Sequence, residues 1–168
     1  PYIGLEHMPR QSIALMDWEG AGKVSSNKAS FNRGDFLFGK LRPYFHKAGI
    51  APVDGICSTD IVVIQPKEVC WSTYTLICIS NIEFINYTNQ GSTGTKMPRT
   101  SWSIMKNFKT IIPSENIAKI FQQVTHPMIE TIISNIHENK KLESLRDTLL
   151  PKLISGDIRV QDIEGEVA

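Results

Sequence analysis

A long helix is predicted near the C-terminal end of the chain, where few residues remain to cover it. Apolar residues recur at helical spacing from Pro127 to Leu150, a stretch that would extend about 36 Å at 1.5 Å per residue. Pro151 is expected to end this helix. Because the segment that follows is short, the apolar face predicts an arm for another helix, which favours a scaffold or specificity protein.

Two helices are predicted after Pro113. The first begins with Ser114 as its N-cap and would be ended by Pro127, which suits the first turn of the next helix. The stripe of the second helix is interrupted by Asn139 and Lys140. Such polar residues would fix the register inside a helix pair, or they would simply be solvated. The residues predicted to contact a partner helix are Ile129, Ile132, Ile136, Leu142, Leu145 and Leu149.

Length and composition indicate one core and an appendage. With 168 residues and 41% apolar content, residues 1–112 are expected to form one domain and residues 113–168 a helical spacer and dimerisation region. No apolar stretch approaches the roughly 20 residues of a membrane span, so a cytoplasmic protein is expected. The three cysteines form no CxxC pair and predict neither disulfides nor a metal site. The chain starts without Met in a strand-like segment, so a fragment of a longer protein is expected.

The two parts differ in charge, although the net charge of the chain is only +1. Residues 1–112 hold 12 Lys and Arg against 8 Asp and Glu, which gives +4, whereas residues 113–168 hold 6 against 9, which gives −3. The first part could therefore meet nucleic acid. The asymmetry is mild and favours DNA binding only in combination with other features.

The first two thirds of the chain predict a curled, largely antiparallel sheet. Gly and Pro recur at short intervals, and between them lie β-type runs at 35–41, 49–51 and 60–65. Further predicted elements are one or two short helices within 70–88, a polar loop at 89–100 and a last strand at 108–113. The expected fold class is α+β, with the sheet domain followed by a long C-terminal helical arm that pairs in a coiled coil.

Catalytic motifs are lacking throughout the sequence. It contains no GxxxxGK[ST], GxGxxG, HExxH or GxSxG motif, and its four histidines are scattered. Asp54, Asp60 and Glu68 are the nearest approach to a nuclease carboxylate cluster, with no suitably placed lysine after Glu68. The chain is therefore expected to have no catalytic or metal-binding residues and no cofactor of its own.

Cations and small hydrogen-bonding side chains gather in the predicted turns of the basic part. DNA-binding surfaces use Lys and Arg for phosphates, and Arg, Asn, Ser, Thr or Lys for base edges. Lys40 and Arg42 could instead pair with Asp35 or Asp60. The candidate DNA-contacting residues are Ser26, Asn27, Lys28, Lys40, Arg42, Lys47, Thr95, Lys96 and Arg99, with base contacts expected around Asn27 and Thr95.

Three stretches resemble one protein family. Residues 26–44 contain the run Gly-Asp-Phe-Leu-Phe-Gly-Lys-Leu-Arg-Pro-Tyr, and residues 145–156 are Leu-Arg-Asp-Thr-Leu-Leu-Pro-Lys-Leu-Ile-Ser-Gly. Together with Gly-Ser-Thr-Gly-Thr at 91–95, these stretches resemble the target recognition domain and conserved helix of type I restriction-modification specificity subunits. The resemblance covers almost the whole chain.

The resemblance implies DNA recognition without catalysis. It implies that the domain reads one half of a split double-stranded DNA target. It also implies that the long helix pairs antiparallel with a counterpart, from a second recognition half or a second copy. The helix pair would act as a spacer and dock methyltransferase subunits, with the restriction subunit joining the same complex. S-adenosylmethionine, ATP and magnesium would be bound by these partners.

Three other classes of protein stay open. An assembly or antirestriction-like protein would bind its partner without DNA. The specificity module of a fused restriction-methyltransferase enzyme would have methyltransferase motifs upstream. An unrecognised nuclease would cleave DNA in the presence of magnesium.

Overall fold

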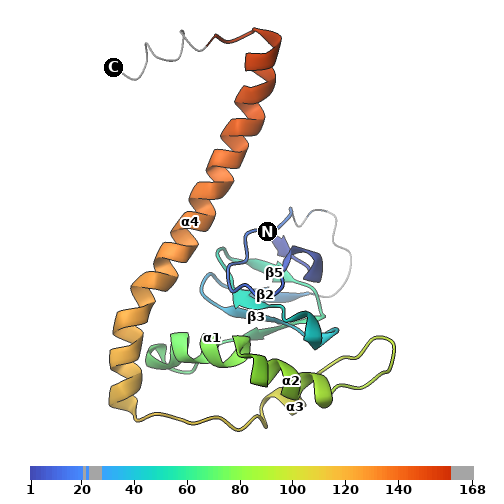
Figure 1. Ribbon diagram of the computed structural model, residues 1–168, viewed down its shortest axis with the longest axis vertical. Coiled ribbons are helices and arrows are strands. Elements are labelled where there is room, and N and C mark those ends of the chain that lie inside the picture. Colours follow the sequence, from blue (N-terminus) through green and yellow to red (C-terminus); the bar gives the residue numbers. More distant parts are fainter. Residues whose placement is uncertain (21, 23–27, 160–168) are drawn as a thin grey trace.

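A domain of two small sheets and short helices lies beside one long helix (Figure 1), and the computed structural model describes residues 1–20, 22 and 28–159. The strands are β1 (Tyr2–Ile3), β2 (Ala29–Phe31), β3 (Phe36–Gly39), β4 (Ala48–Ile50), β5 (Gly55–Cys57) and β6 (Ile61–Ile64). The sheets have the orders β1-β5-β2 and β4-β3-β6, and among the pairs of described strands only β1–β5 is parallel. The predicted α+β class with a mostly antiparallel sheet is confirmed.

Short helices cover one side of the sheets. They are α1 (Ser72–Ser80), α2 (Ile82–Gln90) and α3 (Trp102–Met105), with single 3-10 turns η1 (Leu5–His7), η3 (Pro43–Phe45) and η4 (Val69–Trp71). The helices α1 and α2 confirm the prediction for 70–88, and Asn81 caps α2 by accepting a hydrogen bond of 2.8 Å from the Glu83 N–H. The predicted strand at 108–113 is wrong. This segment pairs with no described strand and links α3 to the long helix, with Ile111 87% exposed.

The strand β3 separates the two halves of the core. Because side chains alternate along a strand, Phe36 and Phe38 pack against the helices, whereas Leu37 packs on the other side. All three side chains are at most 1% exposed, and burying each contributes about 1.5–3 kcal/mol. Both faces of β3 are covered, which explains its uninterrupted apolar sequence.

One continuous helix, α4 (Glu115–Ser155), replaces the two predicted helices. The predicted break at Pro127 and the predicted end at Pro151 are therefore wrong. A proline removes one backbone hydrogen bond, but α4 is held against the domain on both sides of Pro127, with Ala118 buried before it and Ile133 buried after it. The helix ends at Ser155, and the next residue, Gly156, has a φ of 79°, the left-handed conformation that commonly follows the last turn of a helix.

Polar contacts also fasten α4 to the domain. The Gln122 side chain accepts a hydrogen bond of 2.9 Å from the Thr73 N–H in the first turn of α1. Further along, the Lys140 ammonium lies 4.0 Å from the centre of the Trp18 ring and 3.8 Å from the Asp17 carboxylate. Lys140 thus contacts the chain's own domain and is neither a register-fixing residue of a helix pair nor simply solvated. No described helix is long and apolar enough to cross a membrane.

Candidate nucleic-acid interface

Residues 93–99 form a closed loop that projects from the domain (Figure 1). Thr93 and Arg99 exchange two backbone hydrogen bonds of 3.1 and 2.9 Å. Gly94 has a φ of 94°, which side chains rarely adopt. Thr95, Lys96 and Met97 are exposed at the tip. The loop therefore presents a cation and an apolar side chain next to each other in solvent.

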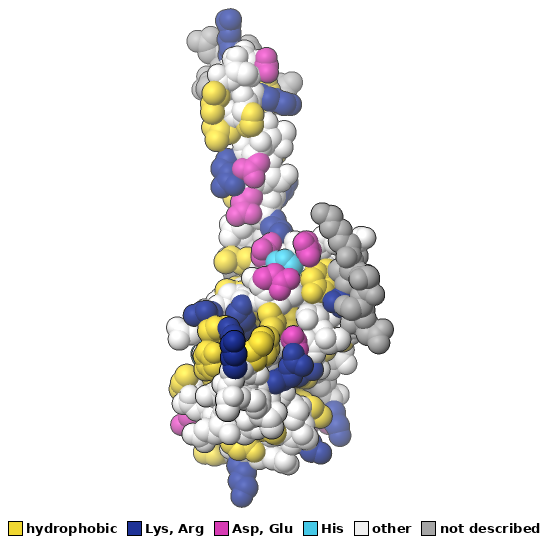
Figure 2. Space-filling view, turned by 90° about the vertical axis from the view of Figure 1, so that its right-hand side faces the viewer, with side chains coloured by type: hydrophobic (Ala, Val, Ile, Leu, Met, Phe, Trp, Pro, Cys, Tyr) yellow, Lys and Arg dark blue, Asp and Glu magenta, His cyan; other side chains and the backbone are white. Residues whose placement is uncertain are grey.

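The base of this loop is fastened to the segment that follows β3. The Arg42 N–H donates to the Pro98 carbonyl at 2.7 Å, and the Thr100 N–H donates to the Lys40 carbonyl at 3.0 Å. Two distant parts of the chain are thereby joined in one surface. We call Lys40, Arg42, Lys96 and Arg99 the basic surface. The side of the molecule that carries the loop faces the viewer in Figure 2, where Lys and Arg side chains surround an apolar patch.

The carboxylates that were alternative partners for Lys40 and Arg42 are otherwise engaged. Asp60 pairs with the Arg99 guanidinium at 2.7 Å, and Asp35 accepts hydrogen bonds from a backbone N–H and from the Gln65 amide. Within residues 1–20, 22 and 28–159, neither Lys40 nor Arg42 forms a salt bridge. The Arg99 and Asp60 side chains are 54% and 25% exposed, and a solvent-accessible pair contributes only about 0–1 kcal/mol, so a phosphate could compete for Arg99.

Lys47 is placed differently from the other predicted cations. Its ammonium donates a hydrogen bond of 2.5 Å to the Leu5 carbonyl, and burial, helped by the nearby Arg10, lowers the pKa of Lys47. This contact ties Lys47 to the backbone of the domain, so the structure gives it a supporting role in place of a free cation. Ser26 and Asn27, which were also predicted to contact DNA, lie outside the described residues.

Lys28 precedes β2 and lies against an aromatic ring of β1. Its ammonium is 4.9 Å from the centre of the Tyr2 ring. Burial raises the pKa of Cys57 to about 11, and the positive charges of Lys28 and Lys40 oppose this shift. Both ammonium groups are therefore close enough to act on one buried thiol, although the two lysines are far apart in the sequence.

An aromatic group adjoins the basic surface. The Arg10 guanidinium lies 3.9 Å from the centre of the Phe45 ring, and the Arg42 guanidinium lies 5.8 Å from the same centre. Tyr44, 49% exposed, meets Phe45 edge-on with 4.8 Å between ring centres. Sequence reasoning missed these residues. Tyr44 and Phe45 follow Arg42 closely, which was a usable signal, but Arg10 had no local signal at all.

The six residues predicted to contact a partner helix fall on two different faces of α4. Ile129 and Ile136 are only 8% and 3% exposed, and Ile132 packs against the core. Their own domain covers these three residues, so they are not free to face a partner. Leu142 and Leu145 are 55% and 46% exposed, and Leu149 is half-buried. Four apolar residues nearer the start of α4 are also exposed and are not among the six predicted contacts, namely Ile117, Ile120, Val124 and Met128.

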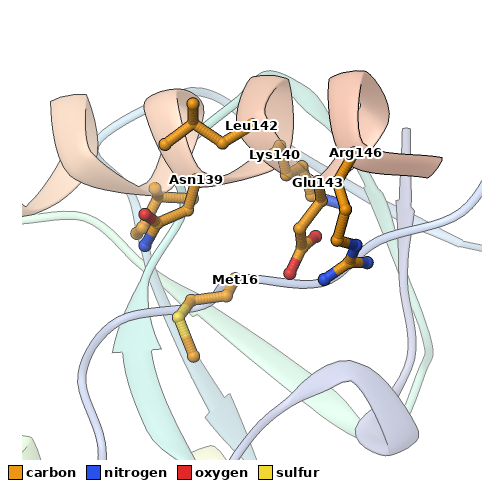
Figure 3. Close-up of a pocket in the computed structure, with 7 residues that line it drawn as sticks. Met16, Asn139, Lys140, Leu142, Glu143 and Arg146 are labelled. Atoms are coloured by element: carbon orange, nitrogen blue, oxygen red, sulfur yellow. The ribbon is translucent and has the colours of Figure 1, made fainter. Parts of the chain in front are cut away.

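Beyond Ile136 a cavity separates α4 from the domain (Figure 3). Its volume is about 390 Å³, and Met16 lies on the domain side. Asn139, Glu143 and Arg146 extend from α4 toward the segment that carries Met16. Asn139, which interrupts the predicted stripe, thus borders this cavity. The cavity marks where the helix leaves the domain.

Among the described residues, one group of three side chains has the spacing of metal ligands. Glu6, His7 and Glu19 bring one ligand atom each within 4.8 Å of the others. However, the His7 Nδ1 accepts a hydrogen bond of 2.9 Å from the Gly4 N–H. In the neutral ring the proton is then on Nε2, which leaves His7 no free lone pair for a metal. This arrangement does not fit a metal site.

A family model now accounts for this combination of a basic loop surface and a long helix. The model described as the type I restriction modification DNA specificity domain matches residues 1–145. The chain belongs to this family. The match includes the whole sheet domain and most of α4. Specificity subunits of type I restriction systems are non-catalytic, and this agrees with the prediction that the chain is not an enzyme.

Individual relatives are named as specificity subunits of type I restriction enzymes. The MjaIX type I restriction enzyme specificity subunit of Methanocaldococcus jannaschii is 28% identical over 169 residues, which cover 97% of this chain and 38% of that protein. The HindI specificity subunit of Haemophilus influenzae is 39% identical over 67 residues, or 40% of this chain and 15% of that protein. This chain therefore spans less than half the length of these relatives.

A solved structure supports the fold. A chain from a structural study of complex assembly and conformational transition in the type I R-M system covers 92% of this chain, with a TM-score of 0.58 and 20% sequence identity. The match covers 41% of that longer chain. At this identity the likeness concerns the arrangement of the sheets and the helix. It agrees with the predicted fold of a sheet domain followed by a long helix.

Proposed function

We propose that the chain recognises one half of a split double-stranded DNA target and carries no catalytic activity. The observation that carries this proposal is the basic surface. Two backbone hydrogen bonds fasten the exposed 93–99 loop to the segment after β3, so that cations from both segments are held together. Cations of this kind contact phosphates, and exposed loop residues between them are in a position to reach base edges.

The charges of the basic surface are available to DNA. Lys96 is exposed, and within the described part of the chain neither Lys40 nor Arg42 has a carboxylate partner. Arg99 is held by Asp60 in a partly exposed ion pair. Because such a pair is weak, exchanging Asp60 for a phosphate costs little. A surface of this kind would bind DNA with a strong dependence on salt.

Selection of duplexes from a random DNA pool tests the recognition itself. The full protein, together with the methyltransferase subunit of its system, should enrich a short motif. A two-fold repeat with a fixed gap would indicate two paired copies. Binding without any enriched motif would contradict sequence-specific recognition and favour an assembly protein.

Salt dependence tests the residues of the basic surface. Lys40→Ala and Lys96→Ala should each lower the slope of log K against log salt by about 0.9, the value for one lost phosphate contact. Lys109→Ala is the matched control, because it removes an exposed lysine from the link between α3 and α4. Equal slopes for all three variants and the unaltered protein would show that the basic surface does not contact DNA.

We also propose that α4 pairs antiparallel with a second helix of the same kind. Its exposed apolar residues are nearly symmetric about Asn135. Met128 and Leu142 each lie 7 residues from it, and Ile120 and Leu150 each lie 15 residues from it. An antiparallel pair centred on Asn135 would therefore bring apolar residues opposite one another. In such a pair an exposed asparagine at the centre would fix the register.

A double-mutant test follows from this symmetry. Val124 and Leu145 lie 11 and 10 residues from Asn135, so they should meet in the pair. Val124→Lys and Leu145→Asp should each weaken self-association in sedimentation experiments, because each places a charge in an apolar contact. The double variant should recover part of the loss through two Lys–Asp contacts. If the unaltered chain is monomeric, the partner helix belongs to a second recognition half. If the losses of the two single variants simply add in the double variant, the proposed register is contradicted.

Catalytic partners complete the proposal. Pairing of α4 would create a spacer on which methyltransferase subunits dock, and the restriction subunit would join the same complex. S-adenosylmethionine, ATP and magnesium would be bound by those subunits. The chain itself would then determine only where on the DNA they act. Methylation of a plasmid that carries the selected motif, compared with one that lacks it, tests this division of roles.

A further inference from the structure

Backbone strain is concentrated next to the basic surface. In the described part of the chain, the non-glycine residues with positive φ are Gln11, Arg42 and His46, with values of 55°, 51° and 53°. Arg42 and His46 flank η3, and the Gln11 N–H donates to the His46 carbonyl at 2.9 Å. All three strained residues thus belong to one pair of joined segments. Such conformations are rarely populated and cluster at ligand-binding sites.

The strained segments hold one arginine in a defined position. The backbone contact between Gln11 and His46 brings Arg10 over the ring of Phe45, with 3.9 Å from the guanidinium carbon to the ring centre. Stacking restricts the guanidinium plane and leaves its edge N–H groups for another partner. Arg10 is exposed and forms no salt bridge within residues 1–20, 22 and 28–159. It is therefore an oriented donor group without a carboxylate.

The surroundings of Arg10 favour a base edge over a phosphate. Phe45 also lies 5.8 Å from the Arg42 guanidinium, which links Arg10 to the basic surface. Two exposed apolar side chains are connected to this group: Tyr44, 49% exposed, meets the Phe45 ring, and Met97, 52% exposed, precedes Pro98, whose carbonyl accepts from the Arg42 N–H. Phosphates are bound by cations and hydroxyl groups, whereas the floor of the major groove offers both hydrogen-bond acceptors and thymine methyl groups. The apolar side chains at the centre of this surface would face the floor of the major groove, and the surrounding cations would face the phosphates of the two strands.

We propose that Arg10 is a specificity-determining residue that reads a guanine of the half-site in the major groove. Its guanidinium would donate two parallel hydrogen bonds to O6 and N7, the geometry that distinguishes guanine from the other bases. Phe45 would act as a positioning residue that holds the plane of the guanidinium. This inference rests on the proposed function and adds to it one residue and one base.

The test uses the full protein with its methyltransferase subunit and the duplex selected by the unaltered protein. Arg10→Ala should bind that duplex about 5- to 150-fold more weakly, the effect of one lost bidentate contact. It should also lose its preference for guanine at a single position of each half-site. Arg10→Lys should restore the salt dependence but not the guanine preference, because an ammonium lacks the planar fork. Unchanged base preferences in Arg10→Ala would overturn the proposal.

Two further variants separate base reading from general effects. Phe45→Leu keeps every charge and an apolar side chain, and it should reduce the preference at the same guanine position. Lys109→Ala removes a lysine from the link between α3 and α4 and should leave all preferences intact. A selected motif without any guanine would overturn the assignment of Arg10 but leave half-site recognition standing. A failure of the unaltered protein to select any motif would instead contradict the proposed function itself.

Discussion

The two faces of α4 predict opposite results for two similar truncations. Ile133 is 1% exposed and packs in the core with β3 and α1, whereas Leu145 is 46% exposed. Ile133→Ala should lower the free energy of unfolding by about 2–5 kcal/mol, since it removes buried groups and leaves a cavity. Leu145→Ala should lower it by less than about 1 kcal/mol in the monomer. The loss of free energy expected for Ile133→Ala is a large fraction of the total stability of a typical domain.

Urea unfolding followed by tryptophan fluorescence measures this difference. With a slope of about 1–3 kcal/mol per M, Ile133→Ala should lower the midpoint by at least roughly 0.7 M, and Leu145→Ala should lower it much less. The protein must be dilute enough to be monomeric, because pairing would also stabilise the side that carries Leu145. Equal midpoints for Ile133→Ala and the unaltered chain would refute the packing of α4 on the domain.

Three other perturbations have defined outcomes. Gly94→Ala should distort the 93–99 loop and weaken DNA binding in a titration, because its φ is 94° and a Cβ would lie 3.3 Å from the Met97 carbonyl oxygen. Gln122→Ala should cost about 1–3 kcal/mol in urea unfolding by leaving the Thr73 N–H without its partner. Burial raises the pKa of the Cys57 thiol from 9.0 to about 11, so the unfolded chain loses this proton at a lower pH than the folded chain. The free energy of unfolding should therefore fall by roughly 2–3 kcal/mol between pH 9 and 11. The fall should be smaller in Cys57→Ala, which has no thiol at this position.

The elements predicted from sequence were those with a strong local pattern. The strands β3, β4 and β6 are apolar runs between turn residues, and their positions were found to within one or two residues. The strands β2 and β5 have three residues each and were not predicted, although β4 is equally short. The segment 108–113 has the composition of a strand, but whether it pairs depends on a neighbouring edge that only the folded domain defines.

The helix α4 shows why the sequence alone cannot tell which apolar residues face the chain's own domain and which face another helix. The sequence pattern treats the apolar residues of α4 as one surface, and it therefore places Ile136 among the contacts with a partner helix. Ile136 is 3% exposed, so Ile136→Asp should instead destabilise the chain's own fold. Both faces consist of aliphatic residues. Only the position of the domain on the helix shows which face remains free.

The candidate site was predictable where basic residues and turns coincide. Lys40, Arg42, Lys96 and Arg99 were selected for that reason, and the structure brings them together through the backbone contacts of the 93–99 loop. The sequence does not single out Arg10, because its proposed role depends on stacking against Phe45, a contact between segments that are distant in the sequence. Composition can suggest which residues bind DNA, but the partners that orient them are set by the fold.

In the folded chain, the positive and negative charges are not divided simply between the residues before and after Pro113. The helix α4 contains five Lys and Arg and five Asp and Glu, so it is neutral overall. The basic surface, in contrast, gathers cations of the domain in one place. Added salt screens phosphate contacts and should weaken DNA binding steeply, whereas burial of apolar residues between helices depends little on charge. Raising the salt concentration should therefore release DNA before it separates paired α4 helices, and the opposite order would contradict an apolar helix interface.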